Sequence, residues 1–217
     1  KAHERRHAAS DIGSVRVSAS RPLLPSAARK STEAVGLASA EQRSDMASPI
    51  IIRAARDAER GELEALQHRA SLAWDAYRDA LLSHPEAIEL PAEHIGQKRV
   101  HVAERGGRIV GFVVVLPRND GAAEIEGLFV EPESWRGGIG TRLIGKAEQM
   151  ASGEGLAYLH VVAAPEAREF YAACGFELVG EEQTRFGKAL AMRKVLAASQ
   201  LLLRPLAESS SRDTARL

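Results

Sequence analysis

One stretch of the chain, residues 128–143, constrains the fold and the function most strongly. It begins with the apolar run Leu128-Phe129-Val130, which is typical of a buried strand, and continues through a short polar turn. Gly137, Gly138 and Gly140 then stand where an amphipathic helix begins. A helix start has backbone N–H groups without intrahelical partners and carries the positive end of the helix dipole. Because glycines leave those groups uncovered, the stretch predicts a binding site for a phosphate or diphosphate.

Two other phosphate-binding loops fit the spacing less well. A dinucleotide fingerprint needs a third glycine where Leu143 stands, and its first glycine follows a strand more closely than Gly138 follows Val130. A mononucleotide loop has a near match in residues 140–147, but Ala147 has no hydroxyl group for a magnesium ion. Its middle residues also look helical, so we treat that match as chance.

A second motif, Phe170-Tyr171-Ala172-Ala173-Cys174-Gly175-Phe176, follows about thirty residues later. Together the two motifs resemble the GNAT family of N-acetyltransferases. Gly138 and Gly140 match the two small-residue positions of that family's diphosphate loop, Gln/Arg-x-x-Gly-x-Gly/Ala, and the second motif, Phe-Tyr-x-x-x-Gly-Phe, is intact. Trp135 stands where the family usually has Gln or Arg, with Arg136 as the neighbouring cation. Ala164 stands near the position where many relatives have an asparagine that binds pantetheine.

Periodicity predicts the order of the elements around these motifs. Antiparallel hairpins, with turns at Gly106-Gly107 and Asn119-Asp120-Gly121, are followed by a β-α-β crossover, which indicates an α/β layer protein. The resemblance implies the same for residues 50–195, namely a GNAT-like mixed, mostly antiparallel sheet with helices on both faces. We expect strands at 49–53, 99–104, 109–116, 124–130, 158–162 and from 176, and helices around 63–81, 139–152 and 166–174.

The two ends of the chain differ from its middle. Residues 1–46 are rich in Ala, Ser and Arg before Met46 and have no aromatic residue, so we predict a disordered N-terminal extension. A transit peptide is the alternative, although five acidic residues argue against it. Residues 47–196 are predicted to form the acetyltransferase domain, and residues 197–217 a C-terminal tail.

The overall composition excludes several classes of partner. Lys+Arg and Asp+Glu balance at 29 each, so no net field attracts nucleic acid or an anionic membrane, and we predict neither as a partner. No apolar run reaches the roughly 18–20 residues that span a bilayer. The lone Cys174 rules out an intramolecular disulfide and fits a reducing compartment, so we predict a cytoplasmic protein. No metal site is predicted.

The resemblance implies direct transfer of an acetyl group from acetyl-CoA, as co-substrate, to a primary amine. The resemblance does not identify the acceptor, which is a small molecule or a protein amine. It also leaves open whether the protein forms a homodimer. The alternative function is a catalytically silent acyl-CoA-binding regulatory module, because a fold does not fix a function. The resemblance also implies the cofactor-binding residues, which are the strand backbone for pantetheine and the glycine loop for the diphosphate. They are Leu128, Phe129, Val130, Arg136, Gly137, Gly138, Ile139, Gly140 and Thr141.

Acetyl transfer needs a base for the ammonium and an acid for the departing thiolate. Tyr171 matches the family's tyrosine, whose phenol protonates the thiolate, although a packing role beside Phe170 and Phe176 needs the same geometry. Glu124 and Glu126 stand two apart on a predicted strand, so both point to one face and are candidate bases. His160, on the neighbouring strand, is a third candidate base. Cys174 is predicted to pack in the core, because it falls near the C-terminal end of its helix.

The acceptor side is the least defined part of the predicted site. In the family it is built largely by the residues between the first two strands, here 56–98, which include Trp74, Tyr77, His84 and His94. Aromatic side chains there could hold an amine by cation–π contact, or could simply face the core. The loop at residues 183–188 is a second candidate border of the acceptor site.

Overall fold

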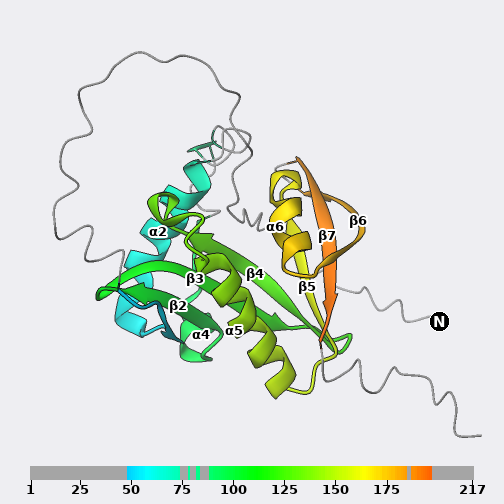
Figure 1. Cartoon of the computed structure of the whole chain (residues 1–217), viewed down its shortest axis with the longest axis horizontal. Helices are drawn as coiled ribbons and strands as arrows, with labels where there is room; N and C mark the ends of the chain where they lie inside the picture. The colour runs from blue at the N-terminus through cyan, green and yellow to red at the C-terminus, as the bar shows by residue number, and fades with distance from the viewer. Residues whose placement is uncertain (1–47, 74–77, 79–81, 84–87, 185–186, 197–217) are drawn as a thin grey trace, which may run out of the picture.

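The computed structural model describes residues 48–73, 78, 82–83, 88–184 and 187–196. These residues form one seven-stranded sheet with helices on both faces (Figure 1). The strands are β1 (Ile51–Ala54), β2 (Val100–Arg105), β3 (Arg108–Pro117), β4 (Ala122–Val130), β5 (Tyr158–Ala163), β6 (Glu177–Thr184) and β7 (Gly187–Val195). The helices are α2 (Arg60–Leu72), α4 (Ala92–Gly96), α5 (Ile139–Gly153) and α6 (Arg168–Ala173), with short 3-10 turns η1 (Asp57–Glu59), η3 (Pro132–Ser134) and η4 (Pro165–Ala167).

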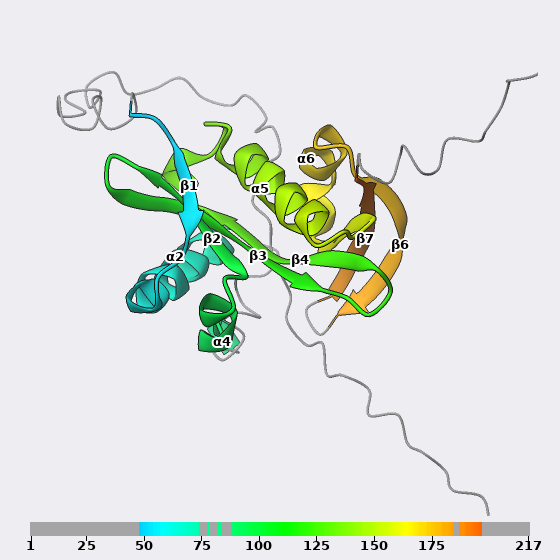
Figure 2. The same ribbon diagram turned by 90° about the horizontal axis from the view of Figure 1, so that it is seen from below.

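The strand order is β1-β2-β3-β4-β5-β7-β6, and β4 and β5 are the one parallel pair in this sheet. Helix α5 makes the crossover between them, as a parallel connection requires. In Figure 2, α5 and α6 cover one face of the sheet, whereas α2 and α4 cover the other. The predicted fold class, a mixed and mostly antiparallel sheet with helices on both faces, is therefore confirmed.

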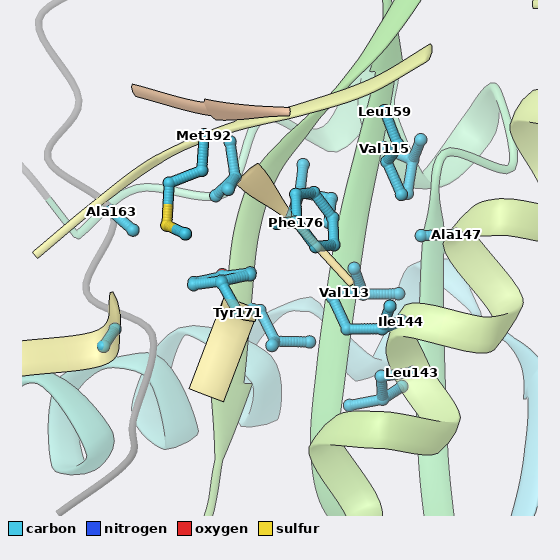
Figure 3. Packing of buried hydrophobic residues seen from close by; sticks show 14 of the residues in the cluster. Val113, Val115, Leu143, Ile144, Ala147, Leu159, Ala163, Tyr171, Phe176 and Met192 are labelled. Carbon is cyan, nitrogen blue, oxygen red and sulfur yellow. The ribbon is translucent and has the colours of Figure 1, made fainter. Parts of the chain in front are cut away.

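Each face of the sheet has its own hydrophobic core. The α5 core joins α5, α6 and the strands β3, β4, β5 and β7, and Figure 3 shows its centre around Tyr171 and Phe176. The α2 core is smaller and packs α2 against β2, β3 and β4. Helix α5 joins its core through the buried residues Ile139, Leu143, Ile144, Ala147 and Ala151, whose spacing gives one apolar face.

The turns follow the glycines that the sequence marks. Gly106 and Gly107, with φ of 56° and 80°, turn β2 into β3, as predicted. Helix α5 ends as expected before Gly155, which has a φ of 71°, and the Leu156 N–H then bonds to the Ala151 carbonyl at 3.0 Å. The predicted helix at 166–174 is shorter than expected, because Pro165 begins the 3-10 turn η4 before α6.

Several predictions fall on parts of the chain outside the described residues. Leu63, Leu66 and Ala70 are buried in α2 as expected, but their predicted continuation through Trp74, Tyr77 and Leu81 lies outside them. The proposed extension at 1–46 and the tail at 197–217 lie outside them too. Within the described part of the chain, no helix has the length and apolar character needed to cross a bilayer.

Candidate functional site

Strands β4 and β5 separate halfway along their length. They pair in parallel from Ala122 with Tyr158 to Ile125 with Val161, and no pair follows. Beyond this point β4 continues to Val130 beside β3, while β5 continues to Ala163 beside β7. The two ribbons diverge in Figure 1. The second half of β4 therefore has one edge that no described strand covers.

The register of β3 and β4 shows which backbone groups face this open edge. The Glu131 N–H donates to the Val110 carbonyl at 3.0 Å, and Gly111 lies opposite Val130. Hydrogen-bonded and non-bonded pairs alternate in an antiparallel ladder, so Val130 and Leu128 direct their backbone groups away from β3. Phe129 directs its backbone groups toward β3 instead. Of the three strand residues predicted to bind pantetheine, two thus have backbone groups on the open edge.

Trp135 covers part of this edge. Its indole Nε1 donates a hydrogen bond of 2.8 Å to the Val130 carbonyl, which links the turn η3 to the end of β4. At the position where the family usually has Gln or Arg, this chain therefore has a side chain that donates a hydrogen bond to a strand carbonyl. The Leu128 backbone groups and the Val130 N–H remain on the open edge.

A β-bulge occurs where β4 separates from β5. Val114 lies opposite Gly127 and Val115 opposite Ile125, so Glu126 has no opposite residue on β3. As a result Ile125 and Leu128, three positions apart, both belong to the α5 core. Glu124 and Glu126 point away from that core, in agreement with their predicted common face. Only Glu126 stands at the separation itself.

Glu124 is already engaged by another side chain. Its carboxylate, with a side-chain exposure of 14%, accepts a hydrogen bond of 2.8 Å from Arg118, which also pairs with Asp120. His160 lies opposite Glu124 in the parallel register. Burial, with Arg118 adding to the effect, lowers the pKa of His160, so this imidazole is neutral at pH 7. Two of the three candidate bases, Glu124 and His160, therefore lie near the Arg118 guanidinium.

Tyr171 is placed in the α5 core, with an exposed fraction of 1%. Its ring meets Phe170 and Phe176 edge to face, with centroid distances of 5.1 and 5.3 Å. Gly175, with a φ of 86°, closes α6 as predicted, and the Phe176 N–H bonds to the Tyr171 carbonyl at 3.0 Å. This environment accounts for the ring of Tyr171. The acid role of its hydroxyl group stays a prediction.

The N-terminus of α5 has backbone donors without intrahelical partners. Gly138 is the N-cap residue, with a φ of 72°, and no side chain caps the helix. The first helical bond runs from the Arg142 N–H to the Gly138 carbonyl at 3.1 Å, so the N–H groups of Ile139, Gly140 and Thr141 precede it. A Cβ atom on Gly138 would meet nothing within 4 Å. The loop therefore has both the donors and the space that a diphosphate requires.

The other two glycines have packing reasons of their own. A Cβ atom on Gly140 would lie 3.0 Å from the ring of Phe170, so the second sequence motif packs directly on the first. A Cβ atom on Gly137 would lie 3.1 Å from the Ser134 carbonyl oxygen and 3.2 Å from Nη2 of Arg105. Of the three glycines, only Gly138 has open space beside it.

Two arginines lie next to this loop. Arg136, the predicted cation, is exposed and has a φ of 65°, which is uncommon for a residue with a side chain. Arg105, the last residue of β2, is buried with its guanidinium beside Gly137. Sequence reasoning missed Arg105. The available signal was an arginine at the end of a strand, directly before the Gly106-Gly107 turn.

Cys174 fits the predicted packing role. It is half-buried at the end of α6, where it packs against the α5 core, and burial raises the pKa of its thiol. Its carbonyl accepts a hydrogen bond of 2.7 Å from Lys194. A protonated thiol is a poor nucleophile, which fits the predicted packing role.

The predicted acceptor side is described only in part. His94 lies on α4, on the α2 face of the sheet, whereas Trp74, Tyr77 and His84 are outside the described residues. The loop at 183–188 joins β6 to β7, and its residues 185–186 are also outside them.

Comparison with protein families matched residues 66–176 to the model of the acetyltransferase (GNAT) family. Solved structures share the fold. The PaiA N-acetyltransferase of Thermoplasma acidophilum, in complex with coenzyme A, is 19% identical with a TM-score of 0.56, over 68% of this chain and 99% of that one. A GCN5-related N-acetyltransferase from Rhodopseudomonas palustris is 22% identical with a TM-score of 0.55, over 69% and 97%.

A ribosomal-protein-alanine N-acetyltransferase from Brucella melitensis is 25% identical to this chain. Its TM-score is 0.52, and the match covers 67% of this chain and 99% of that one. The search among curated proteins gave no match.

Proposed function

Because this chain belongs to the GNAT acetyltransferase family, we propose that it is an N-acetyltransferase that moves an acetyl group from acetyl-CoA directly to a primary amine. The observation that carries the proposal is the uncapped N-terminus of α5. It follows the open edge of β4 by one short turn, so an anion site and an extended backbone edge adjoin each other. Coenzyme A, with a diphosphate joined to a linear pantetheine arm, fits such a surface.

In this proposal, the glycine loop and the open edge of β4 bind different parts of acetyl-CoA. The N–H groups of Gly138, Ile139, Gly140 and Thr141 bind the diphosphate, where the helix dipole adds to the attraction. The pantetheine amides pair with the Leu128 backbone groups and the Val130 N–H on the open edge. The thioester then lies near the point where β4 and β5 separate, which is the position of Glu126.

Glu126 is the base in this proposal. The ammonium form of the acceptor gives a proton to the Glu126 carboxylate, directly or through water, and the free amine attacks the thioester carbonyl carbon. The new C–N bond forms as the C–S bond breaks, and the Tyr171 phenol protonates the departing thiolate. The proton that the new amide nitrogen loses returns through solvent to the phenolate. Glu124 is less suited by position, because it lies within the paired part of β4 and β5, before the strands separate. The acceptor is a primary amine of a small molecule or of a protein.

A binding and turnover assay tests the proposed function. Acetyl-CoA is expected to raise the melting temperature of the protein, and free thiol is expected to appear when an amine from a panel of small molecules and peptides is added. Binding of acetyl-CoA with no thiol release for any amine, including the lysines of the protein itself, would favour the silent acyl-CoA-binding alternative. If acetyl-CoA does not bind, both the acetyltransferase proposal and the silent-module alternative are refuted.

The two glutamates are separated by matched amide substitutions. Glu126→Gln is expected to lower kcat about tenfold to a hundredfold, because an amide cannot accept the ammonium proton. Glu124→Gln keeps the strand geometry and is expected to lower kcat less than threefold. Raising the pH should restore part of the Glu126→Gln rate, since more of the acceptor is then a free amine. A larger loss in Glu124→Gln than in Glu126→Gln would reverse the assignment.

A further inference from the structure

Arg105 is a buried cation that has no counter-ion among the described residues. Its residue exposure is 8%, its Nε is fully buried without a hydrogen-bond partner, and no ion pair joins it to the described residues. Two half-buried arginines of the domain behave differently. Arg53 pairs with Glu59 and Glu104, and Arg99 pairs with Glu154. The lack of a carboxylate beside Arg105 therefore distinguishes it from them.

An unpaired buried guanidinium is energetically unfavourable. A buried charge without a partner is unfavourable, and an apolar side chain of similar volume is often better tolerated at such a position. An anion that binds beside the guanidinium would offset this cost.

The strand geometry directs Arg105 toward the start of α5. Glu104 pairs with Arg53 of β1, whereas Arg105, opposite Arg108, stands two positions after Ala103 of the α5 core and so shares its side of the sheet. A Cβ atom on Gly137 would lie 3.2 Å from Nη2 of Arg105. Gly137 directly precedes the N-cap Gly138, so the guanidinium lies beside the backbone donors of the helix start.

We propose that Arg105 is a ligand of the coenzyme A diphosphate, which it binds together with the N–H groups at the start of α5. This inference rests on the proposed function and adds a residue from β2 to its site. A guanidinium and a phosphate form charge-assisted, commonly bidentate hydrogen bonds, which are stronger than those between neutral groups. The glycine at position 137 is part of the arrangement, because a side chain there would meet the guanidinium.

Arg105→Met tests the proposal, with Arg108→Met as the matched control. Methionine keeps much of the buried volume and removes the charge. Arg108 lies in the same hairpin and opposite Arg105, but it is exposed and lies 3.8 Å from Glu133. Calorimetric titration is expected to show about 10- to 50-fold weaker binding of coenzyme A in Arg105→Met, and less than threefold weaker binding in Arg108→Met. Arg105→Lys is expected to recover part of the loss.

Two further measurements separate phosphate binding from a structural role. Arg105→Met is expected to lose as much affinity for 3′-dephospho-CoA, which keeps the diphosphate, as for coenzyme A. With S-acetyl-pantetheine, which has no phosphate, its kcat/KM is expected to equal that of the wild type. The melting temperature of Arg105→Met without ligand is expected to be unchanged or higher, because an uncompensated charge has been removed. A purely structural arginine would give a lower melting temperature and a loss with both substrates.

Distinct results overturn this inference and the proposed function. Wild-type affinity of Arg105→Met for coenzyme A overturns the ligand role of Arg105 while leaving the acetyltransferase proposal intact. A loss that vanishes with 3′-dephospho-CoA overturns the assignment to the diphosphate. A wild-type protein that binds no coenzyme A at all overturns the proposed function itself.

Discussion

Gly138→Asp is expected to bind acetyl-CoA about 100-fold to 1,000-fold more weakly than the wild-type protein. Gly138 has a φ of 72°, where a residue with a side chain is strained by about 1–3 kcal/mol. The carboxylate would also stand at the helix start, a few ångströms from the diphosphate, where like charges repel by about 1–4 kcal/mol. The strain is present in the free and the bound protein alike, so it lowers stability rather than affinity. The repulsion acts on binding, and the carboxylate also accepts N–H bonds of the helix start that the diphosphate needs. Since about 1.4 kcal/mol corresponds to a factor of ten, these two effects on binding give the expected loss. Isothermal titration of acetyl-CoA measures it.

Gly155→Asp is a matched control for the strain. Gly155 has a φ of 71°, a Cβ atom there would also meet nothing within 4 Å, and it follows the opposite end of α5. Its substitution should lower the melting temperature by a similar amount while leaving the affinity for acetyl-CoA within about twofold. Gly138→Asn isolates the charge, because asparagine tolerates this conformation better than most residues. Wild-type affinity in Gly138→Asp would refute the diphosphate site.

The order of the elements could be predicted because periodicity and glycine turns are local properties. The bulge at Glu126 could not. Strict alternation places Ile125 and Leu128 on opposite faces of a strand, yet both join the α5 core. The extra residue follows from how β4 meets β3 and separates from β5, which is set by pairing far apart in the sequence. The common face of the two glutamates was predicted, but their different surroundings were not.

The glycine loop shows the same division between local and tertiary information. Its glycines predicted a ligand site, and Gly138 fits that reading. Gly140 has another partner, because Phe170 of α6 packs where its side chain would be. The two motifs, which the sequence presents as separate signals, are thus one packed unit in the structure.

The sequence marks Arg105 only as an arginine at the end of a strand and does not show what sets it apart. Its distinctive property is the lack of a counter-ion, and that depends on every element packed around it. Arg53, only a strand away, illustrates the usual outcome, since Glu59 and Glu104 both reach it. Sequence patterns reveal which residues could carry charge, whereas only the structure shows which charges lack a partner.

Tyr171→Phe is expected to lower kcat about 100-fold or more and to leave the affinity for acetyl-CoA within about twofold. General acid catalysis typically contributes a factor of about 10²–10⁴, and the substitution removes only the donating hydroxyl group. The edge-to-face contacts with Phe170 and Phe176 involve the ring, which phenylalanine keeps. If Tyr171 serves only packing, kcat should therefore be almost unchanged. Steady-state kinetics with titration of acetyl-CoA distinguishes the two roles.

Tyr158→Phe is the matched control, because it removes the same group from a tyrosine at the closed end of the β4–β5 pair. There the ring lies under Arg193 at 4.8 Å, a contact that also survives the loss of the hydroxyl group. Its kcat should stay within about twofold of the wild type. The Tyr171→Phe defect should also be smaller with acetyl donors whose leaving thiol has a low pKa, since a weakly basic thiolate needs no proton to depart. An equal defect with every donor would assign the lost hydroxyl to positioning rather than to acid catalysis.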